Sequence, residues 1–376
     1  MADDASPAAF PAGLRAALEK TPGLACVDFP QLGTAQVALF YRGPGPRSAA
    51  AVTAVGEFLR SRSGVVVLGA TAEAWRAVPG FVPQILGAVP GGPFAGGAAM
   101  SVINLYPHPI FAGVNRFETT QPMAAFGQLA DDAQMIMEGT AGEDTTPLGW
   151  VRRGAAGRLC HLVPAESAVL QDPAYQRIVV NAVRWAAGRP IPDARPAVQR
   201  TFMPDAYPGS IALTFPNGPG VCIDPVRGGI NTIWDGDFVD LRPRWITKQG
   251  APARIFGEVF YTEKAPQPLR LGSPSADSKF RFRGYVLRDG VPEFHYEIDG
   301  RDVYETITAQ ADGQGIVRTF RVGPGARTLW MNFEPQTGAE VTTRGLERDG
   351  AAGSFAASAG GQFVIEIRRK TGGAIR

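Results

Sequence analysis

Residues 147–188 read PLGWVRRGAAGRLCHLVPAESAVLQDPAYQRIVVNAVRWAAG and decide how the first half of the chain folds. A turn-rich approach leads into a short apolar run over residues 158–163, which is typical of a buried strand. Pro173 suits the first turn of the helix that follows, and Gly188 suits the position after its end. The helix is predicted by apolar residues that share one face: Tyr175, Ile178, Val179, Ala182, Trp185 and Ala186. A strand, a loop and a closing helix are typical of the last unit of an open α/β sheet.

The chain before this stretch alternates helical and strand patterns. Helices are predicted over residues 10–20 and after Ser48, and strands over residues 24–29, 35–41, 65–68, 100–105 and 131–137. The loops between the first of these elements are short. This order predicts an α/β, doubly wound, mostly parallel sheet.

The chain after residue 188 has a different pattern. Residues 189–199 hold three prolines and no apolar period, which is typical of a linker. Beyond residue 199, short segments alternate apolar with polar residues between Gly, Pro, Asp and Asn turns, which predicts an antiparallel β-sandwich. We therefore expect an α/β domain over residues 1–188, a linker over 189–199 and a β-sandwich domain over 200–376.

The composition excludes several classes of protein. The 376 residues include 37 basic and 35 acidic side chains, and no basic stripe is interleaved with aromatics, so nucleic acid is not an expected partner. No apolar run reaches the roughly 20 residues of a membrane span. Cys26, Cys160 and Cys222 lack the spacing of a zinc knuckle or of covalent haem attachment. Neither a metal nor a cofactor is expected.

The first ten residues, MADDASPAAF, resemble a mature N-terminus with an initiator Met placed before it. This resemblance predicts a periplasmic or secreted protein. A cytoplasmic location stays open.

Three stretches in the same order resemble the ThuA-like family, named for trehalose utilisation. They are GVVVLGATAEAW at residues 64–75, HPIFAGVNRF at 108–117, and the strand and helix of 158–188. The resemblance implies a flavodoxin-like fold of the class I glutamine amidotransferase type, with carbohydrate metabolism as its setting. That family begins with a central strand, which has no counterpart before Phe10. We therefore expect a sheet without its first strand, whose vacant position a partner protein could fill.

The family's polar site is mostly absent from this chain. The resemblance places Gly69 where the family has a histidine, and it retains Trp75 and His108. Its other polar segments correspond here to Gln121-Pro122-Met123-Ala124 and Ala165-Glu166-Ser167. No cysteine follows the strand at residues 65–68, which excludes thioester chemistry of the amidotransferase kind.

Ligands of open α/β sheets bind beyond the carboxyl ends of the strands, so the loops there supply the candidates. Glu73, His108 and Glu166 are the candidate catalytic acids and bases, and Trp75 and Gln121 the candidate substrate-binding residues. The alternatives are that His108 caps a backbone group and that the glutamates are solvated loop acids. His161, inside a predicted buried strand, is expected to be a satisfied core group.

In the second half, aromatic and charged residues are densest over residues 234–245. Aromatic faces beside carboxylates and arginines suit carbohydrate, because the ring stacks on C–H groups while charges bind the hydroxyls. The candidate substrate-binding residues are Trp234, Asp237, Arg244 and Trp245. The alternative is that the tryptophans belong to the core and the acids to turns.

Two functions stay open. The first is a non-catalytic, carbohydrate-related binding or assembly subunit, a pseudoenzyme whose partner completes the sheet or belongs to a redox or cytochrome complex. The cytochrome association comes from residues 229–245 and 257–272, which resemble segments found downstream of ThuA-like domains in bacterial proteins that carry cytochrome c modules. The alternative is a carbohydrate-processing enzyme, a keto-sugar isomerase or a hydrolase. The lost polar residues and the missing strand favour the first.

Overall fold

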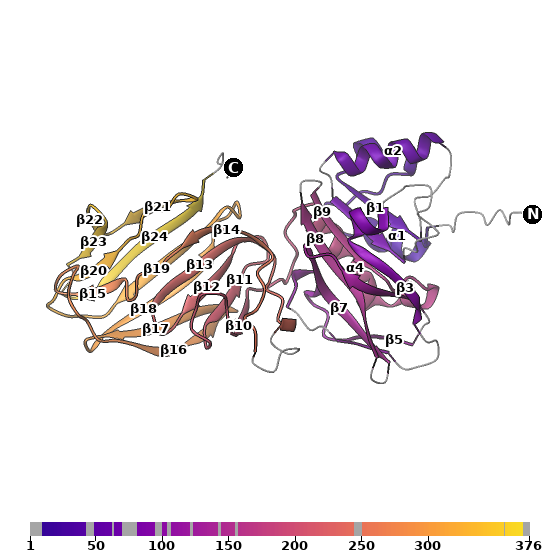
Figure 1. Cartoon of the computed structure of the whole chain (residues 1–376). Helices are drawn as coiled ribbons and strands as arrows, with labels where there is room; N and C mark the ends of the chain where they lie inside the picture. Colours follow the sequence, from indigo (N-terminus) through magenta and orange to yellow (C-terminus); the bar gives the residue numbers. More distant parts are fainter. Residues whose placement is uncertain are drawn as a thin grey trace, which may run out of the picture. The chain divides into compact units, whose positions relative to one another are not determined.

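The computed structural model describes residues 10–42, 49–61, 64–69, 81–94, 100–103, 107–120, 123–141, 144–154, 157–243, 250–356 and 358–370. The chain divides into two compact units, Met1–Ala194 and Arg195–Arg376 (Figure 1), and each is described by itself.

A seven-stranded sheet forms the centre of the first unit, in the order β1-β2-β9-β8-β7-β4-β5. Two further strands, β3 and β6, pair with each other outside this sheet. The strands are β1 (Val37–Tyr41), β2 (Gly64–Leu68), β3 (Ala88–Phe94), β4 (Met100–Ile103), β5 (Phe117–Thr119), β6 (Met123–Leu129), β7 (Ala133–Ala141), β8 (Asp144–Gly154) and β9 (Gly157–Leu162).

The sheet is mixed, so the prediction of a mostly parallel sheet is not met. Among the described strands, only β1, β2 and β9 run parallel to one another, and the remaining pairs are antiparallel. The short connections between consecutive strands explain the antiparallel pairs. Two residues separate β7 from β8, and two separate β8 from β9. A connection that short forms a hairpin, whereas a parallel crossover needs a dozen or more residues.

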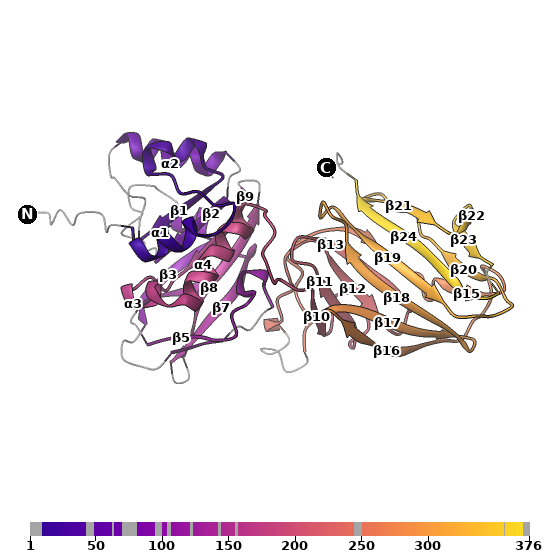
Figure 2. The ribbon, with the colours of Figure 1, turned by 180° about the vertical axis from the view of Figure 1, so that it is seen from behind.

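Helices cover one face of this sheet (Figure 2). Helix α4 packs on β1, β2 and β9, and α1 packs on α3 and α4. The opposite face meets β6, which packs on β8. The helices are α1 (Ala12–Glu19), α2 (Ala49–Arg60), α3 (Ser167–Gln171) and α4 (Pro173–Ala186), with the shorter turns η1 (Phe29–Thr34), η2 (Phe81–Leu86) and η3 (Pro109–Phe111). Within the described residues, no helix is long and apolar enough to span a membrane.

The predicted strand over residues 24–29 is wrong, because the described chain there is irregular and leads into η1. No strand precedes β1 among residues 10–36, and β1 is an edge of the sheet. The predicted helix over residues 173–186 is confirmed as α4, and its six predicted apolar residues are all buried.

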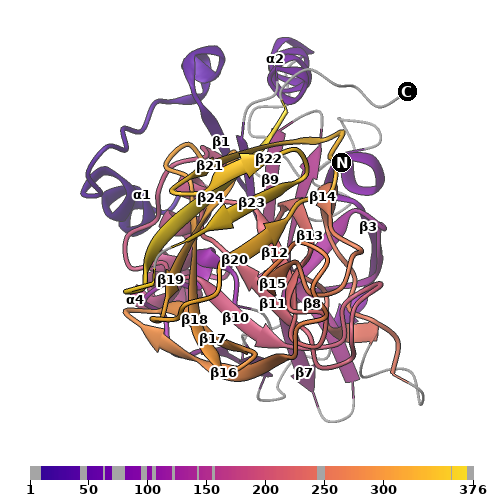
Figure 3. The ribbon, with the colours of Figure 1, turned by 90° about the vertical axis from the view of Figure 1, so that its left-hand side faces the viewer.

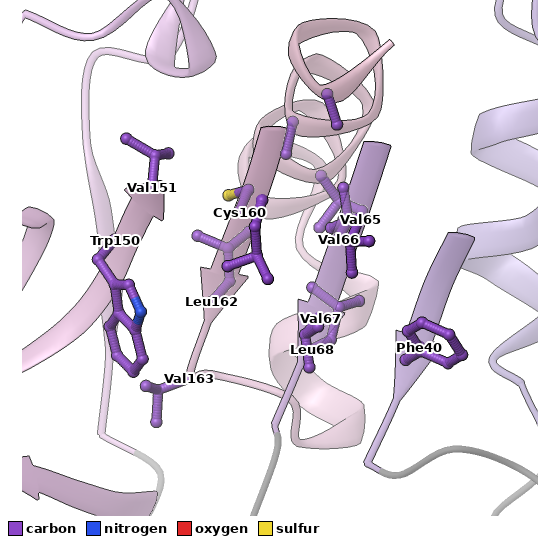
Figure 4. Close-up of a cluster of buried hydrophobic side chains, with 14 of the residues drawn as sticks. Phe40, Val65, Val66, Val67, Leu68, Trp150, Val151, Cys160, Leu162 and Val163 are labelled. Atoms are coloured by element: carbon purple, nitrogen blue, oxygen red, sulfur yellow. The ribbon is translucent and has the colours of Figure 1, made fainter. Parts of the chain in front are cut away.

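The core of the first unit lies around β2 and β9. Val65, Val66, Val67 and Leu68 are each at most 3% exposed, so both faces of β2 are covered (Figure 4). A strand covered on both faces reads as a continuous apolar run, because every second side chain faces a different layer. This is why the sequence identified β2.

The second unit consists of antiparallel strands in three sheets (Figure 3). The sheet orders are β10-β11-β12-β13-β14, β15-β20-β23-β22 and β16-β17-β18-β19-β24-β21. The strands are β10 (Ala197–Arg200), β11 (Ile211–Thr214), β12 (Gly220–Asp224), β13 (Gly229–Gly236), β14 (Gly257–Thr262), β15 (Leu269–Leu271), β16 (Phe280–Arg288), β17 (Val291–Ile298), β18 (Arg301–Ala309), β19 (Gly315–Val322), β20 (Leu329–Asn332), β21 (Ala339–Arg344), β22 (Glu347–Asp349), β23 (Ala352–Phe355) and β24 (Gly361–Arg369).

One hydrophobic core joins these sheets, as in a β-sandwich. It includes Leu213 and Ile233 from the five-stranded sheet and Phe294 and Phe320 from the six-stranded sheet. Strand β24 comes last in the chain yet lies inside its sheet, between β19 and β21.

Candidate functional site

The carboxyl ends of the three parallel strands form the candidate ligand edge of the first unit. Arg42 follows β1, Gly69 follows β2, and a loop over residues 163–166 follows β9. Because the three strands are parallel neighbours, these positions lie at one end of the sheet. This edge therefore holds the polar groups that a bound ligand would meet first.

An ion pair joins two of these segments. The Nη2 atom of Arg42 lies 2.6 Å from Oε2 of Glu166, and it donates to the carbonyl of Ala165 at 3.2 Å. The Tyr41 hydroxyl donates to the same carbonyl at 3.3 Å. Both charged side chains are roughly two-fifths exposed, at 37% and 46%, so solvent reaches the pair. The pair neutralises Glu166 and leaves it accessible.

Gly69 occupies a position that excludes a side chain. Its φ is +61°, in the left-handed region, where other residues are strained. A Cβ atom there would lie 2.3 Å from the Cβ atom of Ala165. The resemblance puts a histidine at this position, and the local backbone of this chain has no room for one.

The loop after β9 is held by helix α4. The Tyr175 hydroxyl, wholly buried, donates to the carbonyl of Pro164. The Asp172 side chain caps the helix by accepting from the Ala174 amide at 2.7 Å. The first turn of α4 therefore lies at the carboxyl edge of the sheet, beside Glu166.

His108 lies in a different place. Its Nδ1 atom accepts from the Ile110 amide at 3.3 Å, at the start of η3. Its ring packs edge-on against Trp185, with the ring centroids 5.5 Å apart, and only 3% of the residue is exposed. The backbone-capping alternative from the sequence fits this geometry.

The length of α4 separates His108 from Glu166. Trp185 lies twelve residues after Pro173, the first residue of α4, which corresponds to about 18 Å along the helix axis. Its carbonyl accepts from Arg158 at the beginning of β9, so it marks the amino ends of the strands. The structure therefore places His108 and Glu166 at opposite ends of the sheet and does not bring them together.

The other candidates of the first unit, Glu73, Trp75 and Gln121, lie outside the described residues, as do Arg244 and Trp245 of the second.

Trp234 is part of the core of the second unit. The side chain is fully buried, and its Nε1 atom donates to the Asp237 carbonyl at 3.0 Å. One side of the indole rests on Gly220, where a Cβ atom would lie 2.0 Å from Cε2. Asp237 is only 8% exposed. A ring enclosed in this way has no free face on which a sugar could stack, so the core-tryptophan alternative describes it.

A charged cluster inside the second unit was missed by sequence reasoning. Arg318 on β19 and Glu305 on β18 are each 1% exposed, and Nε donates to Oε1 at 2.6 Å. The Tyr296 hydroxyl donates to the other oxygen of Glu305 at 2.8 Å. Nearby, burial raises the pKa of Glu263 to about 8, against a lowering effect of Arg318. The sequence signal was Arg318 placed between Ile316 and Phe320, which share its buried face of β19.

His161 is buried as expected but not satisfied by the described residues. Its ring lies between Trp150 and Phe126, with centroid distances of 4.2 and 5.3 Å. Neither ring nitrogen has a hydrogen-bond partner within the described part of the chain. Burial lowers the pKa of His161 to about 3, so the ring is neutral at pH 7.

In the part of the chain that the structure describes, no three His, Cys, Asp or Glu side chains cluster as metal ligands would.

Neither a protein-family model nor a curated protein matches this sequence. Among solved structures, the chain is similar to a protein from Parabacteroides merdae ATCC 43184, provisionally described as ThuA-like. The match has 13% sequence identity and a TM-score of 0.32, and it covers 48% of this chain and 77% of the other. A likeness at this level establishes neither a family nor an activity.

Proposed function

We propose that this protein is a non-catalytic binding or assembly protein of carbohydrate metabolism. The observation that carries the proposal is the separation of His108 from Glu166 by the length of α4. Proton transfer between neighbouring carbons needs an acid and a base aimed at one substrate. His108 caps η3 at one end of the sheet, so Glu166 at the other end has no histidine partner among the described residues of the first unit.

The residues at the candidate ligand edge are suited to binding a ligand without catalysing a reaction on it. Arg42 and Glu166 form an ion pair at 2.6 Å, so the charges of the two side chains compensate each other. Both remain accessible, and guanidinium and carboxylate groups both form hydrogen bonds with hydroxyls. Gly69, where the resemblance puts a histidine, has no space for that side chain. The edge therefore suits a polar ligand such as a sugar that is held and not converted.

Two assays on the full chain test this proposal. Isothermal titration calorimetry with keto-sugars and disaccharides measures binding, and product analysis after prolonged incubation measures turnover. We expect binding without turnover, and weaker binding in Arg42→Met and Glu166→Gln by about tenfold, the effect of one lost charge-assisted hydrogen bond. Glu19→Gln is the matched control, because Glu19 forms an exposed pair with Arg15 at 2.9 Å on α1.

Turnover that is lost in Glu166→Gln would restore the enzyme alternative and end this proposal. If no sugar binds, the carbohydrate part fails. The assembly part is tested by isolating the protein from its source and determining the size and composition of the complex. A monomer that binds neither sugar nor protein would contradict the whole proposal.

A further inference from the structure

Strand β16 is an unpaired edge of the six-stranded sheet. It is nine residues long and pairs with β17 on one side only. Among the described residues, no backbone hydrogen bond outside the sheet ladder involves residues 280–288. In an antiparallel edge strand, every second residue directs its N–H and C=O groups away from the sheet. A β-bulge between Phe282 and Gly284 interrupts this alternation in β16, so about four residues, in two separate runs, have no described backbone partner on the outer side of the strand.

The second half of this strand also exposes apolar side chains. Val286 is 52% exposed and Leu287 is 57% exposed. Neighbouring residues of a strand point to opposite faces, so an added strand would find an apolar contact on each face. The first half is anchored, because Phe280 and Phe282 pack against the core. The edge is therefore fixed in place, and none of the described segments pairs with its outer side.

Arginines outnumber acids along this edge. Glu297 of β17 accepts from Arg283 at 3.0 Å, and Arg281 lies 3.9 Å from its other oxygen. Glu293 accepts from Arg288 at 3.0 Å and from Arg321 of β19 at 3.3 Å. Burial alone would raise the pKa of Glu293, but these two arginines hold it below its ordinary value. The four guanidinium groups lie beside three carboxylates, those of Glu293, Glu297 and Asp302 of β18, which leaves an excess of one positive charge.

Arg321 is held in place by a stack across three strands. Its Cζ atom lies 3.9 Å above the centre of the Tyr304 ring, and His295 stacks on Tyr304 at 4.5 Å. His295 also contacts Asp302 at 2.8 Å. These contacts fix the guanidinium before any partner arrives, which lowers the entropy that binding would cost. We call Arg281, Arg283, Val286, Leu287, Arg288 and Arg321 the β16 edge patch.

The charge pattern excludes a second copy of this strand as the occupant. The sequence of β16, FRFRGYVLR, contains three arginines and no acid. Pairing β16 with itself would place arginines beside arginines and add together the net positive charge of two copies, and like charges on paired strands are destabilising. An extended segment that carries acids instead would meet complementary charge.

We propose that the β16 edge patch binds an extended acidic segment of a partner protein by strand addition. Main-chain hydrogen bonds to β16 hold the segment, its acids meet the net positive charge of the patch, and its apolar residues cover Val286 and Leu287. This inference rests on the proposed function, because it names the surface through which an assembly protein would assemble.

The test uses the full chain and two labelled octapeptides, one alternating Glu with Val and the other Lys with Val. Fluorescence anisotropy measures affinity at low and high salt, and hydrogen–deuterium exchange measures protection of individual amides. We expect the acidic peptide to bind, to weaken with salt, and to slow exchange within residues 280–288. The basic peptide should not bind.

Variants separate this edge from the rest of the sheet. Arg281→Ser/Arg288→Ser should weaken binding at least tenfold. Arg344→Ser is the matched control, because Arg344 lies on β21 at the opposite edge of the same sheet, is 73% exposed and pairs with Glu366 at 2.6 Å. It should leave the affinity unchanged. Near-ultraviolet circular dichroism confirms that each variant is folded.

Several results would overturn the inference. They are no binding of the acidic peptide, equal binding of the basic one, equal loss in Arg344→Ser, or binding without protection of β16. Heparin that binds the patch without slowing exchange would assign the arginines to polyanion binding instead. Sugar turnover would refute the proposed function while leaving strand addition measurable. If the protein shows neither sugar turnover nor peptide binding, strand addition at β16 is refuted and the proposed function is not.

Discussion

Replacing Glu305 by glutamine removes the charge that compensates Arg318 inside the second unit. Both side chains are 2% exposed, so solvent cannot screen the remaining guanidinium. Breaking a buried pair in this way costs about 3–5 kcal/mol of unfolding free energy. Glu263 reduces the loss, because its pKa of about 8 is raised by burial and also by Glu305, and without Glu305 it ionises more readily beside Arg318. We therefore expect the lower end, about 3 kcal/mol.

Thermal unfolding followed by circular dichroism and urea unfolding at pH 7 measure this effect. A loss of about 3 kcal/mol corresponds to a fall in melting temperature of about 6–12 °C for a unit of this size. Glu366→Gln is the control, because its ion pair with Arg344 is exposed and worth at most about 1 kcal/mol. Glu305→Gln/Arg318→Met should regain most of the stability, since it leaves no buried charge. If Glu305→Gln lowers the free energy of unfolding by no more than Glu366→Gln does, the Glu305–Arg318 pair does not behave as a buried ion pair.

Three further predictions concern single positions. In the folded state the pKa of Glu263 is about 8, above its ordinary value, so the folded chain binds the extra proton and stability falls as pH rises from about 4.5 to 8. Glu263→Gln should flatten the urea-unfolding free energy across that range, and an unchanged slope would contradict the assignment. Gly69→Ala should lower the free energy of unfolding by about 2 kcal/mol, because the new Cβ atom is strained at positive φ and collides with the Cβ atom of Ala165. The double variant Gly69→Ala/Ala165→Gly should recover only the part of this loss that the collision causes. If Gly69→Ala is as stable as the parent protein, the backbone geometry described for Gly69 is wrong. His161→Phe should keep or raise the free energy of unfolding at pH 7. The pKa of His161 is about 3 in the folded protein and near 6.5 in the unfolded one, so the parent protein loses stability as the pH falls from about 6.5 to 3. The phenylalanine variant lacks this proton-linked loss and should unfold at a lower pH. Equal acid unfolding of the two proteins would count against a buried neutral ring.

Sequence patterns were informative where one residue period dominated. Helix α4 was predicted because its apolar residues keep one face over fourteen residues, and β2 because it is apolar throughout. Strand β8 was missed, because Pro147 and the flanking Thr and Arg residues resemble a turn. The strand predicted over residues 24–29 has a suitable apolar pattern but no neighbour to pair with. Pairing is a tertiary property that local pattern does not contain.

The candidate site was harder to predict for the same reason. His108 and Glu166 both follow strand-like runs, and only the packing of η3 along α4 shows that they lie at different ends of the sheet. Trp234 has the composition of a sugar-binding residue, but its contact with Gly220, fourteen residues earlier, encloses the ring. Glu305 and Arg318 likewise pair only after two strands have aligned. Residue type indicates what a side chain can do, and the fold decides whether it is in a position to do it.

The interior position of β24 determines when the second unit can form during protein synthesis. Strands β16 to β19 leave the ribosome first, but the partner that covers β19 is β24, the last of the described strands. The ribosome adds about 5–20 residues per second, so the edge of β19 stays unpaired for several seconds while the segment between β19 and β24 is synthesised. During this time the apolar positions that Phe363, Ile365 and Ile367 later fill are open to other chains. Nascent copies that stall before β24 are therefore candidates for chaperone capture or aggregation, whereas the first unit has its whole sheet before the second begins.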